Sequence, residues 1–206
     1  MDLKELKINL DLDISKQIIT SNILLDNLRV INEDSRKTSA YVDPRYIPFY
    51  YYLGKYLKPR NIIEIDFSLA FFSTCFIKSC KTVENFLAFQ ESGEEYYSNN
   101  LALKNIKTVY HGHLDYYEGR INDKIFQDII SQNKWDLVLF NEEKNYDKHL
   151  LHLDVMWSHL NMGGYIVMDY INSHENAKLA FHNFAKIENR EPIILTTRYG
   201  VGIIQK

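Results

Sequence analysis

Lys144 and Asp169 are two residues of this sequence whose side chains could do chemistry, Lys144 as a base and Asp169 as an oxygen ligand. Lys144 belongs to the polar run Asn141-Glu-Glu-Lys-Asn-Tyr146, and Asp169 directly follows the apolar segment 165–168. A lysine whose pKa is lowered by its surroundings can act as a general base, and a carboxylate can hold a cation or orient a substrate. The alternative interpretation of Lys144 is a surface lysine that pairs with a neighbouring glutamate.

Asn141 follows a second apolar segment, 135–140. If the two apolar segments are adjacent parallel strands, Asn141 and Asp169 lie at the same edge of a sheet, and their oxygen atoms can share a cation. The pair offers only one carboxylate and one amide, so a divalent ion held there should bind weakly. We therefore treat Asn141 and Asp169 as weak metal ligands and expect no resident divalent metal.

Two further positions also follow apolar segments. Asp66 comes after 61–65, in the run Asp66-Phe-Ser-Leu-Ala70, and Gln90 comes after 85–89. Nucleotide-binding sheets place glycines at the first position, for close backbone approach, and an acid at the second, for the ribose. Here Asp66 either caps the following helix or contacts a cationic or amine group. Gln90 either replaces the ribose-binding acid or lies in a solvated loop.

The histidines and cysteines form no strong metal motif. His149, His152 and His159 lie in one predicted helix, and we interpret them as half-buried residues beside its apolar stripe rather than as a metal-binding face. Cys75 and Cys80 are five residues apart on another predicted helix, so they do not face each other. We interpret them as reduced core thiols of a cytosolic protein.

The elements that must position these residues alternate between short apolar segments and helical patterns. After helical stretches within the first 40 residues and at 46–57, the sequence predicts five strands that each precede a helix. The predicted strands are 61–65, 85–89, 107–111, 135–140 and 165–169, and the helices that follow them are 69–79, 94–103, 123–131, 147–160 and 175–187. This order predicts an α/β fold with a Rossmann-like, doubly wound and mostly parallel sheet.

The C-terminal residues break this alternation. Two apolar segments, 192–197 and 201–205, are joined by Arg198-Tyr-Gly200. So short a connection requires antiparallel strands, so we expect a hairpin at the sheet edge. We divide the chain into an N-terminal helical extension or lid, 1–45, and a Rossmann-like domain, 46–206. Ligands of such sheets bind beyond the carboxyl ends of the strands, where the polar residues above are expected.

Three stretches resemble class I S-adenosylmethionine-dependent methyltransferases, and among them small-molecule O-methyltransferases of the cation-dependent catechol and caffeoyl-CoA type. Ile62-Ile-Glu-Ile-Asp66 lies where that family has an apolar strand with Glu-Ile-Gly. Asp136-Leu-Val-Leu-Phe-Asn-Glu-Glu-Lys-Asn-Tyr146 is similar to its Asp-Leu-x-Phe-x-Asp-x-Asp-Lys-x-x-Tyr stretch. Leu160-Asn-Met-Gly-Gly-Tyr-Ile-Val-Met-Asp169 is similar to its Leu-x-x-Gly-Gly-x-x-x-x-Asp. The similarity covers about residues 45–206.

The resemblance implies a role for each residue at a strand end. The residues expected to contact S-adenosylmethionine are Asp66, Ser68 and Ala70 in the family's glycine loop, Gln90 at its ribose-binding acid, Gly112 and His113 in its adenine-side loop, and Asn141. Asp66 adds a side chain where φ is expected to be positive. Lys144 matches the lysine that takes the substrate's hydroxyl proton in some of these enzymes, and Asp169 is the second expected catalytic residue. The family's cation site corresponds to Asn141, Asp169 and Tyr170.

Composition limits the remaining function classes. Glycine occurs only 8 times in 206 residues, and none lies between Gly54 and Gly93, the interval that holds the cofactor loop. The net charge of −3 provides no basic field for nucleic acid, no apolar run is long enough for a membrane span, and the first residues do not form a secretory signal. We expect a cytoplasmic protein that binds a small-molecule substrate, contacts neither nucleic acid nor membrane, and forms, if any assembly, a homodimer.

Two functions remain open from the sequence, and they leave open whether the protein is an enzyme. One is S-adenosylmethionine-dependent O-methylation of a small hydroxylated molecule, a sugar or an aromatic, which Lys144 favours. The other is a catalytically inactive methyltransferase-fold protein that acts as a binding or oligomerising partner, with a crevice filled by Phe67, Phe71 and Phe72. Binding of a different nucleotide is a weaker third hypothesis, because the glycine signatures of such sites are missing.

Overall fold

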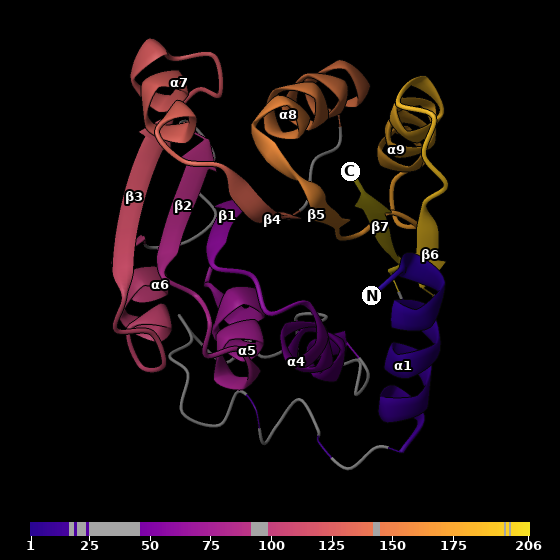
Figure 1. The fold of residues 1–206 in the computed structure, drawn as a ribbon. Helices are drawn as coiled ribbons and strands as arrows, with labels where there is room; N and C mark the ends of the chain where they lie inside the picture. Colours follow the sequence, from indigo (N-terminus) through magenta and orange to yellow (C-terminus); the bar gives the residue numbers. More distant parts are fainter. Residues whose placement is uncertain are drawn as a thin grey trace.

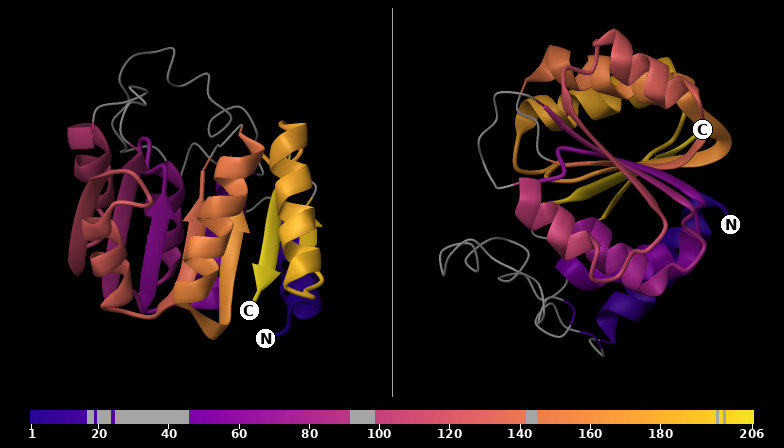
Figure 2. Two further views of the ribbon diagram at one scale, coloured as in Figure 1. Left: turned by 90° about the horizontal axis from the view of Figure 1, so that it is seen from above. Right: turned by 90° about the vertical axis from the view of Figure 1, so that its left-hand side faces the viewer.

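The computed structural model describes residues 1–16, 19, 24, 46–91, 99–141, 145–195, 197 and 199–206. Its strands form a seven-stranded sheet that lies between two layers of helices (Figure 1, and edge-on in Figure 2). The helices are α1 (Leu3–Ser15), α4 (Tyr46–Leu57), α5 (Phe71–Ser79), α6 (Asn99–Ile106), α7 (Lys124–Ser131), α8 (Tyr146–His159) and α9 (Glu175–Ile187). The strands are β1 (Asn61–Ile65), β2 (Asn85–Glu91), β3 (His113–Gly119), β4 (Trp135–Phe140), β5 (Leu160–Met168), β6 (Ile193–Leu195) and β7 (Val201–Gln205).

The strand order is β3-β2-β1-β4-β5-β7-β6. The pairs from β3 to β5 are all parallel, whereas β7 runs antiparallel to both β5 and β6. This confirms the predicted Rossmann-like, mostly parallel α/β sheet with an antiparallel C-terminal hairpin. The chain reverses its direction of winding between β1 and β4, and the carboxyl ends of these two strands meet where Ile65 pairs with Phe140. Ligands of doubly wound sheets bind at such a switch point.

Each face of the sheet buries its own apolar cluster, because side chains alternate in direction along a strand. On one face, α1, α4, α5 and α6 cover a cluster that includes Ile62, Leu139 and Val167. On the other face, α7, α8 and α9 cover a cluster that includes Ile63 and Val138. The two faces therefore differ in which strand residues they present to the helices, and this alternation decides where each polar residue at a strand end points.

Helices α4 and α5 cross closely at Gly54. A Cβ at this position would lie 2.3 Å from the carbonyl oxygen of Phe76, so only glycine permits the approach. The Ser79 hydroxyl also donates a hydrogen bond to the carbonyl oxygen of Tyr51, at 2.5 Å. This contact fixes α4 along α5, and it leaves the first turn of α4, with Tyr46 and Tyr50, beside the residues that follow β5.

Helix α1 is attached to the end of α4 through Asp13, a carboxylate that is 7% exposed. The Asp13 carboxylate accepts hydrogen bonds from Lys55 Nζ at 2.8 Å and from the Tyr56 hydroxyl at 2.6 Å, and Lys16 Nζ lies at 3.1 Å. These donors hold the pKa of Asp13 well below its ordinary value. The part of the predicted N-terminal helical extension between residues 25 and 45 lies outside the described residues, and the division of the chain at residue 45 stays a prediction.

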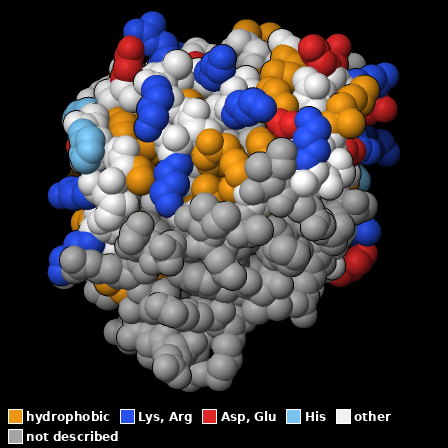
Figure 3. Space-filling model, turned by 90° about the horizontal axis from the view of Figure 1, so that it is seen from below, with side chains coloured by type: hydrophobic (Ala, Val, Ile, Leu, Met, Phe, Trp, Pro, Cys, Tyr) orange, Lys and Arg blue, Asp and Glu red, His pale blue; other side chains and the backbone are white. Residues whose placement is uncertain are grey.

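Basic side chains, Lys and Arg together, are scattered over the described part of the side that α1, α4, α5 and α6 form (Figure 3). Neither α4, α5 nor α6 contains an acidic residue, and each has a lysine in its last turn, Lys55, Lys78 and Lys104. Cations at these positions stabilise the negative end of a helix dipole. Among the described residues, no helix is long and apolar enough to cross a membrane.

The predicted third strand, 107–111, is wrong: β3 begins later, at His113. Residues 107–110 instead finish the turn after α6, where the backbone N–H of Tyr110 bonds to the carbonyl of Ile106 at 2.9 Å. The Tyr110 hydroxyl then donates to the carbonyl oxygens of Glu84 and His113, at 2.7 and 3.0 Å. The error arises because β3 is an edge strand with several exposed side chains, so it lacks the apolar run that marks a central strand.

Candidate functional site

The loop Asp66–Ala70 lies at the switch point, directly after β1. Asp66, Ser68 and Ala70 all have left-handed backbone, with φ values of 59°, 47° and 59°. Left-handed backbone costs a residue with a side chain about 1–2 kcal/mol of conformational free energy, whereas glycine adopts it freely. Aspartate tolerates this conformation better than most residues. The loop therefore has the conformation of a glycine loop although it contains no glycine, as the sequence implied for Asp66.

Backbone and core contacts hold this loop in place. The N–H groups of Asp66 and Phe67 both donate to the carbonyl of Phe89 in β2, at 2.9 and 3.3 Å. The Phe67 side chain is 1% exposed and packs against the ring of Phe86, with ring centroids 5.8 Å apart. Buried Asn105 in α6 donates from Nδ2 to the carbonyl of Leu69 at 3.0 Å. These contacts stabilise a backbone that its own side chains disfavour.

Gln90 reaches the loop from the end of β2. Its side-chain Oε1 accepts a hydrogen bond from the backbone N–H of Ser68 at 3.3 Å. The next residue, Glu91, points to the other face of the sheet, where its Oε2 lies 2.9 Å from Lys148 Nζ and 3.5 Å from His152 Nε2. Of the two neighbours, Gln90 is therefore the residue that can act together with the loop.

Asn141 joins the same group from the end of β4. Its backbone N–H donates to the carbonyl of Ile65 at 3.1 Å, and its side-chain Nδ2 donates to the carbonyl of Asp66 at 3.0 Å. The structure thus brings together Asp66, Ser68, Ala70, Gln90 and Asn141, five of the residues predicted to contact the cofactor. Lys144, the predicted base, lies outside the described residues.

Asp169 follows β5 and is 2% exposed. Its Oδ1 accepts a hydrogen bond from the backbone N–H of Tyr170 at 2.8 Å, and Tyr170 has left-handed backbone with φ of 55°. Among the described residues, Oδ2 of Asp169 has no hydrogen-bond partner. Burial raises the pKa of Asp169 well above its ordinary value, and the Tyr170 hydrogen bond only partly opposes this effect.

The donors at the predicted cation position do not fit a divalent ion. Asn141 directs its amide nitrogen at a carbonyl oxygen, and the ring of Tyr170 packs against Tyr46 and Tyr199, with centroids 6.1 and 5.1 Å apart. Asp169 is then the one carboxylate of the predicted set, whereas divalent cations require several oxygen ligands. In the part of the chain that the structure describes, no group of three or more His, Cys, Asp or Glu could hold a metal.

Glu64 is a buried acid of the site that sequence reasoning did not single out. It precedes Asp66 by two residues on β1 and is 1% exposed. Burial raises its pKa to about 8; a hydrogen bond with Ser73 acts in the opposite direction, and the charge of Asp66 adds to the rise. The available signal was a charged residue in the middle of an apolar strand, because an unpaired charge is rarely buried without a function.

A group of aromatic rings, also not predicted as part of the site, lies beside these acids. We call it the tyrosine wall, and its members are Tyr46 and Tyr50 of α4, Phe72 of α5, Tyr170 after β5 and Tyr199 before β7. The sequence contains runs of adjacent tyrosines, such as Tyr50-Tyr51-Tyr52. Nothing in the sequence indicated which of them would meet, because the wall joins four segments that are far apart along the chain.

Gly112 and His113 do not join the site, which corrects the expectation that they line it. His113 pairs with Asn85, the first residue of β2, so both residues lie at the edge where the parallel strands begin. The mistaken third strand caused this error. Gly119 ends β3 at the carboxyl edge, and a Cβ there would lie 2.6 Å from a ring carbon of Tyr117, so a larger residue at this position would require the Tyr117 side chain to shift.

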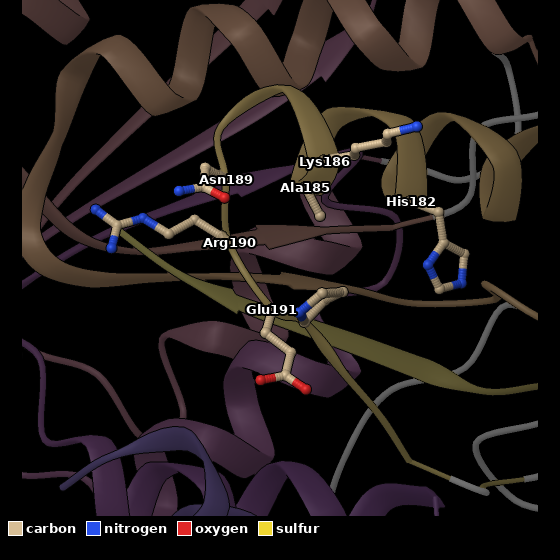
Figure 4. A pocket seen from close by; sticks show the side chains of 7 residues that line it. His182, Ala185, Lys186, Asn189, Arg190 and Glu191 are labelled. Atoms are coloured by element: carbon tan, nitrogen blue, oxygen red, sulfur yellow. The ribbon is translucent and has the colours of Figure 1, made fainter.

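Two other features stand apart from the site. His149 and His152 are 2% and 1% exposed, so they are core residues rather than half-buried ones as predicted, and Nε2 of His149 lies 3.2 Å from the Met168 sulfur. A hollow of about 430 Å³ lies where α9 ends and β6 begins (Figure 4). The side chains of His182, Lys186 and Arg190 point away from one another there, so they do not converge on a ligand.

Comparisons with known proteins support the fold. No protein-family model and no curated protein matches the sequence. Solved structures do match. The SAH-bound methyltransferase PaMTH1 of Podospora anserina is similar with a TM-score of 0.66 and 13% identity, over 100% of this chain and 97% of that chain.

Two further solved structures show the same likeness. The Bacillus cereus O-methyltransferase in complex with SAH has a TM-score of 0.66 and 13% identity, over 98% of this chain and 100% of that one. The SAM-bound O-methyltransferase TomG of Streptomyces achromogenes, which is involved in tomaymycin synthesis, has a TM-score of 0.58 and 13% identity, over 100% and 99%. The chain therefore has the fold of class I S-adenosylmethionine-dependent methyltransferases and resembles the small-molecule O-methyltransferases among them.

Proposed function

We propose that this protein binds S-adenosylmethionine at the carboxyl edge of its sheet and transfers the methyl group to a small hydroxylated molecule, a sugar or an aromatic. The conformation of the loop Asp66–Ala70 carries this proposal, because it places three residues with side chains in a backbone form suited to glycine. The loop leads directly into α5, and the N-terminal end of a helix offers a ligand its first N–H groups and a favourable dipole. The likeness to SAH-bound and SAM-bound methyltransferases supports the same site.

Three side chains beside the loop would hold the cofactor. The Gln90 amide combines a donor and an acceptor, which suits the two hydroxyls of a ribose. The Asp66 carboxylate would attract the ammonium group of the methionine part, and the Asn141 amide, which lies beside the loop, would contact the cofactor there. Bound there, the cofactor supplies a methyl group attached to a positively charged sulfur.

The chain's own contribution to transfer would be alignment of the acceptor and removal of its proton. Transfer needs the acceptor oxygen in line with the methyl group, so a small misplacement slows it strongly. Lys144, three residues after Asn141, would take the hydroxyl proton as a general base. Asp169, at the end of the neighbouring strand, would position the acceptor through its buried carboxyl group.

A second function is favoured by the region after β5. Tyr170 stands at a position where a cation ligand was expected, and its ring is packed into the tyrosine wall. A chain that lost catalysis but kept the fold would show such a replacement, and it would act as a binding or oligomerising partner. The two functions differ in turnover, and binding of the cofactor alone does not separate them.

Titration with S-adenosylmethionine and S-adenosylhomocysteine tests the proposed function. A ligand present at 100 times its Kd should stabilise the protein by about 2.7 kcal/mol, which is measurable as a rise in the thermal unfolding midpoint. ATP serves as the control nucleotide and should produce no rise. The absence of any rise at millimolar S-adenosylhomocysteine would contradict the proposal, and a rise with ATP alone would favour a different nucleotide.

A further inference from the structure

The tyrosine wall combines the properties of a surface that holds positive charge. Tyr46 contacts Tyr50, Phe72, Tyr170 and Tyr199, with ring centroids 5.2–6.3 Å apart and the rings tilted steeply to one another. Aromatic rings attract cations through the negative charge of their faces. Here the rings come from four separate segments, so the wall is a product of the fold rather than of a local repeat.

Two buried acids lie on the same side of the sheet as this wall. Glu64 follows Ile62 by two residues, and Asp169 follows Val167 by two residues, so each points to the face covered by α4 and α5. Tyr50 connects the wall to the first acid, because the nearby Glu64 and Tyr170 both add to the raised pKa that burial gives Tyr50.

Each acid has an oxygen that the described residues leave without a hydrogen-bond partner. These atoms are Oε2 of Glu64 and Oδ2 of Asp169, and the hydroxyl of Tyr46 shares the property. The three residues are 1%, 2% and 0% exposed. Buried polar atoms are rarely left unpaired, so three of them beside one aromatic wall indicate that a ligand supplies the missing partner.

No positive side chain of the described residues balances these acids. The groups that influence Glu64 are Ser73 and Asp66, and the group that influences Asp169 is the backbone of Tyr170. A negatively charged or strongly electron-rich ligand would be repelled by the two carboxyl groups when they ionise. A positively charged group would instead gain both from them and from the rings.

We propose that the acceptor molecule of this protein carries a positively charged nitrogen, which binds between the tyrosine wall and the carboxyl groups of Glu64 and Asp169. This inference rests on the proposed function, because it names the substrate class of the same site. The substrate class is then a small hydroxylated amine or quaternary ammonium compound. S-adenosylmethionine has positive groups of its own, its sulfonium and its ammonium, so a test must separate the cofactor from the acceptor.

Choline and 3,3-dimethylbutan-1-ol provide a matched pair of probes. Both have a hydroxyl group and three methyl groups on a tetrahedral centre, and only choline is charged. The protein is first saturated with S-adenosylhomocysteine, whose binding is measured separately, and each probe is then titrated by NMR. We expect choline to bind about tenfold more tightly than the neutral alcohol to this complex.

Two variants test whether the carboxyl groups cause the preference for the charged probe. Asp169→Asn and Glu64→Gln remove a carboxyl group with little change in shape, and each should reduce the preference for choline severalfold, whichever of the two folds better. Glu84→Gln is the control, because this glutamate is exposed, lies at the opposite edge of the sheet and pairs with Arg60 at 2.5 Å. The control should keep the full preference.

Three results would overturn the inference. Equal affinities for the two probes would show that charge is not recognised. Binding of choline to the free protein but not to its complex with S-adenosylhomocysteine would assign the wall to the cofactor's own positive groups. Failure of S-adenosylhomocysteine to bind, which is scored before any probe is added, would overturn the proposed function and this inference with it.

Discussion

Two regions meet at the carboxyl edge of the sheet: one follows β1, and the other follows β4 and β5. They differ in whether the backbone or the side chains resemble those of methyltransferases. After β1, the backbone of Asp66, Ser68 and Ala70 has the form of a glycine loop while the side chains differ. After β5, Asp169 remains, but Tyr170 turns its ring into an aromatic cluster. If the proposed function holds, the first region would contact the cofactor through its backbone, which tolerates new side chains, whereas a site made by side chains, as expected in the second region, does not.

The largest effect is expected at the second region, from Lys144→Ala. If the proposed function holds, this variant should lose about 10²–10⁴-fold in kcat, because general base catalysis contributes on that scale, and its affinity for S-adenosylhomocysteine should not change. Turnover with a radiolabelled methyl group and calorimetric binding measure the two quantities. Lys148→Ala is the control, since Lys148 pairs with Glu91 on the other face of the sheet. Unchanged kcat would remove Lys144 from the reaction.

The second prediction concerns the pH dependence of stability, and it tests whether burial raises the pKa of Glu64. The pKa of Glu64 is about 8 in the folded protein and 4.5 for the ordinary group, so its contribution to stability is complete below pH 4.5 and is lost as the pH rises to 8. Glu64→Gln should therefore gain stability relative to the natural protein over this interval, by up to about 5 kcal/mol at 1.36 kcal/mol per pKa unit.

Urea unfolding at pH 5 and at pH 8 measures this difference. Glu84→Gln, at an exposed site, should track the natural protein at both values. The same pH dependence in Glu64→Gln and in the natural protein would mean that Glu64 is not held protonated by burial.

A smaller effect is expected in the first region, where Ser68→Gly should raise the free energy of unfolding by about 1 kcal/mol. Glycine adopts φ of 47° without the clash that a Cβ causes. Ser131→Gly is the control at an exposed position in the last turn of α7, where the backbone is helical and glycine should destabilise by about 0.5–1 kcal/mol. A loss of stability in Ser68→Gly would mean that the loop does not have the strained conformation described.

The smallest effect is expected from Asp66→Gly, which separates backbone contact from side-chain contact. Because the Asp66 carboxylate is proposed to attract the cofactor's ammonium group, glycine should weaken the affinity for S-adenosylhomocysteine a few-fold, as measured by calorimetry. Improved binding would instead mean that the carboxylate only obstructs the loop.

The sequence predicted the sheet well and the site only in part. Alternation of apolar segments and helices was enough for β1, β2, β4 and β5, because central strands are buried on both faces. It failed for β3, whose exposed residues resemble a loop, and this failure misplaced Gly112 and His113. Local motifs pointed to Asp66, Gln90 and Asn141, each at the end of a central strand. The tyrosine wall was beyond sequence reasoning, because Tyr46 and Tyr199 meet only through the tertiary fold.

Hydrogen–deuterium exchange with and without S-adenosylhomocysteine tests the central claim most directly. If the loop after β1 binds the cofactor through its backbone, amides of residues 66–72 and of Gln90 should exchange more slowly in the complex. Amides around the hollow between α9 and β6, at the opposite edge, should be unaffected. Protection at that hollow, or no protection of the loop at saturating ligand, would contradict the account.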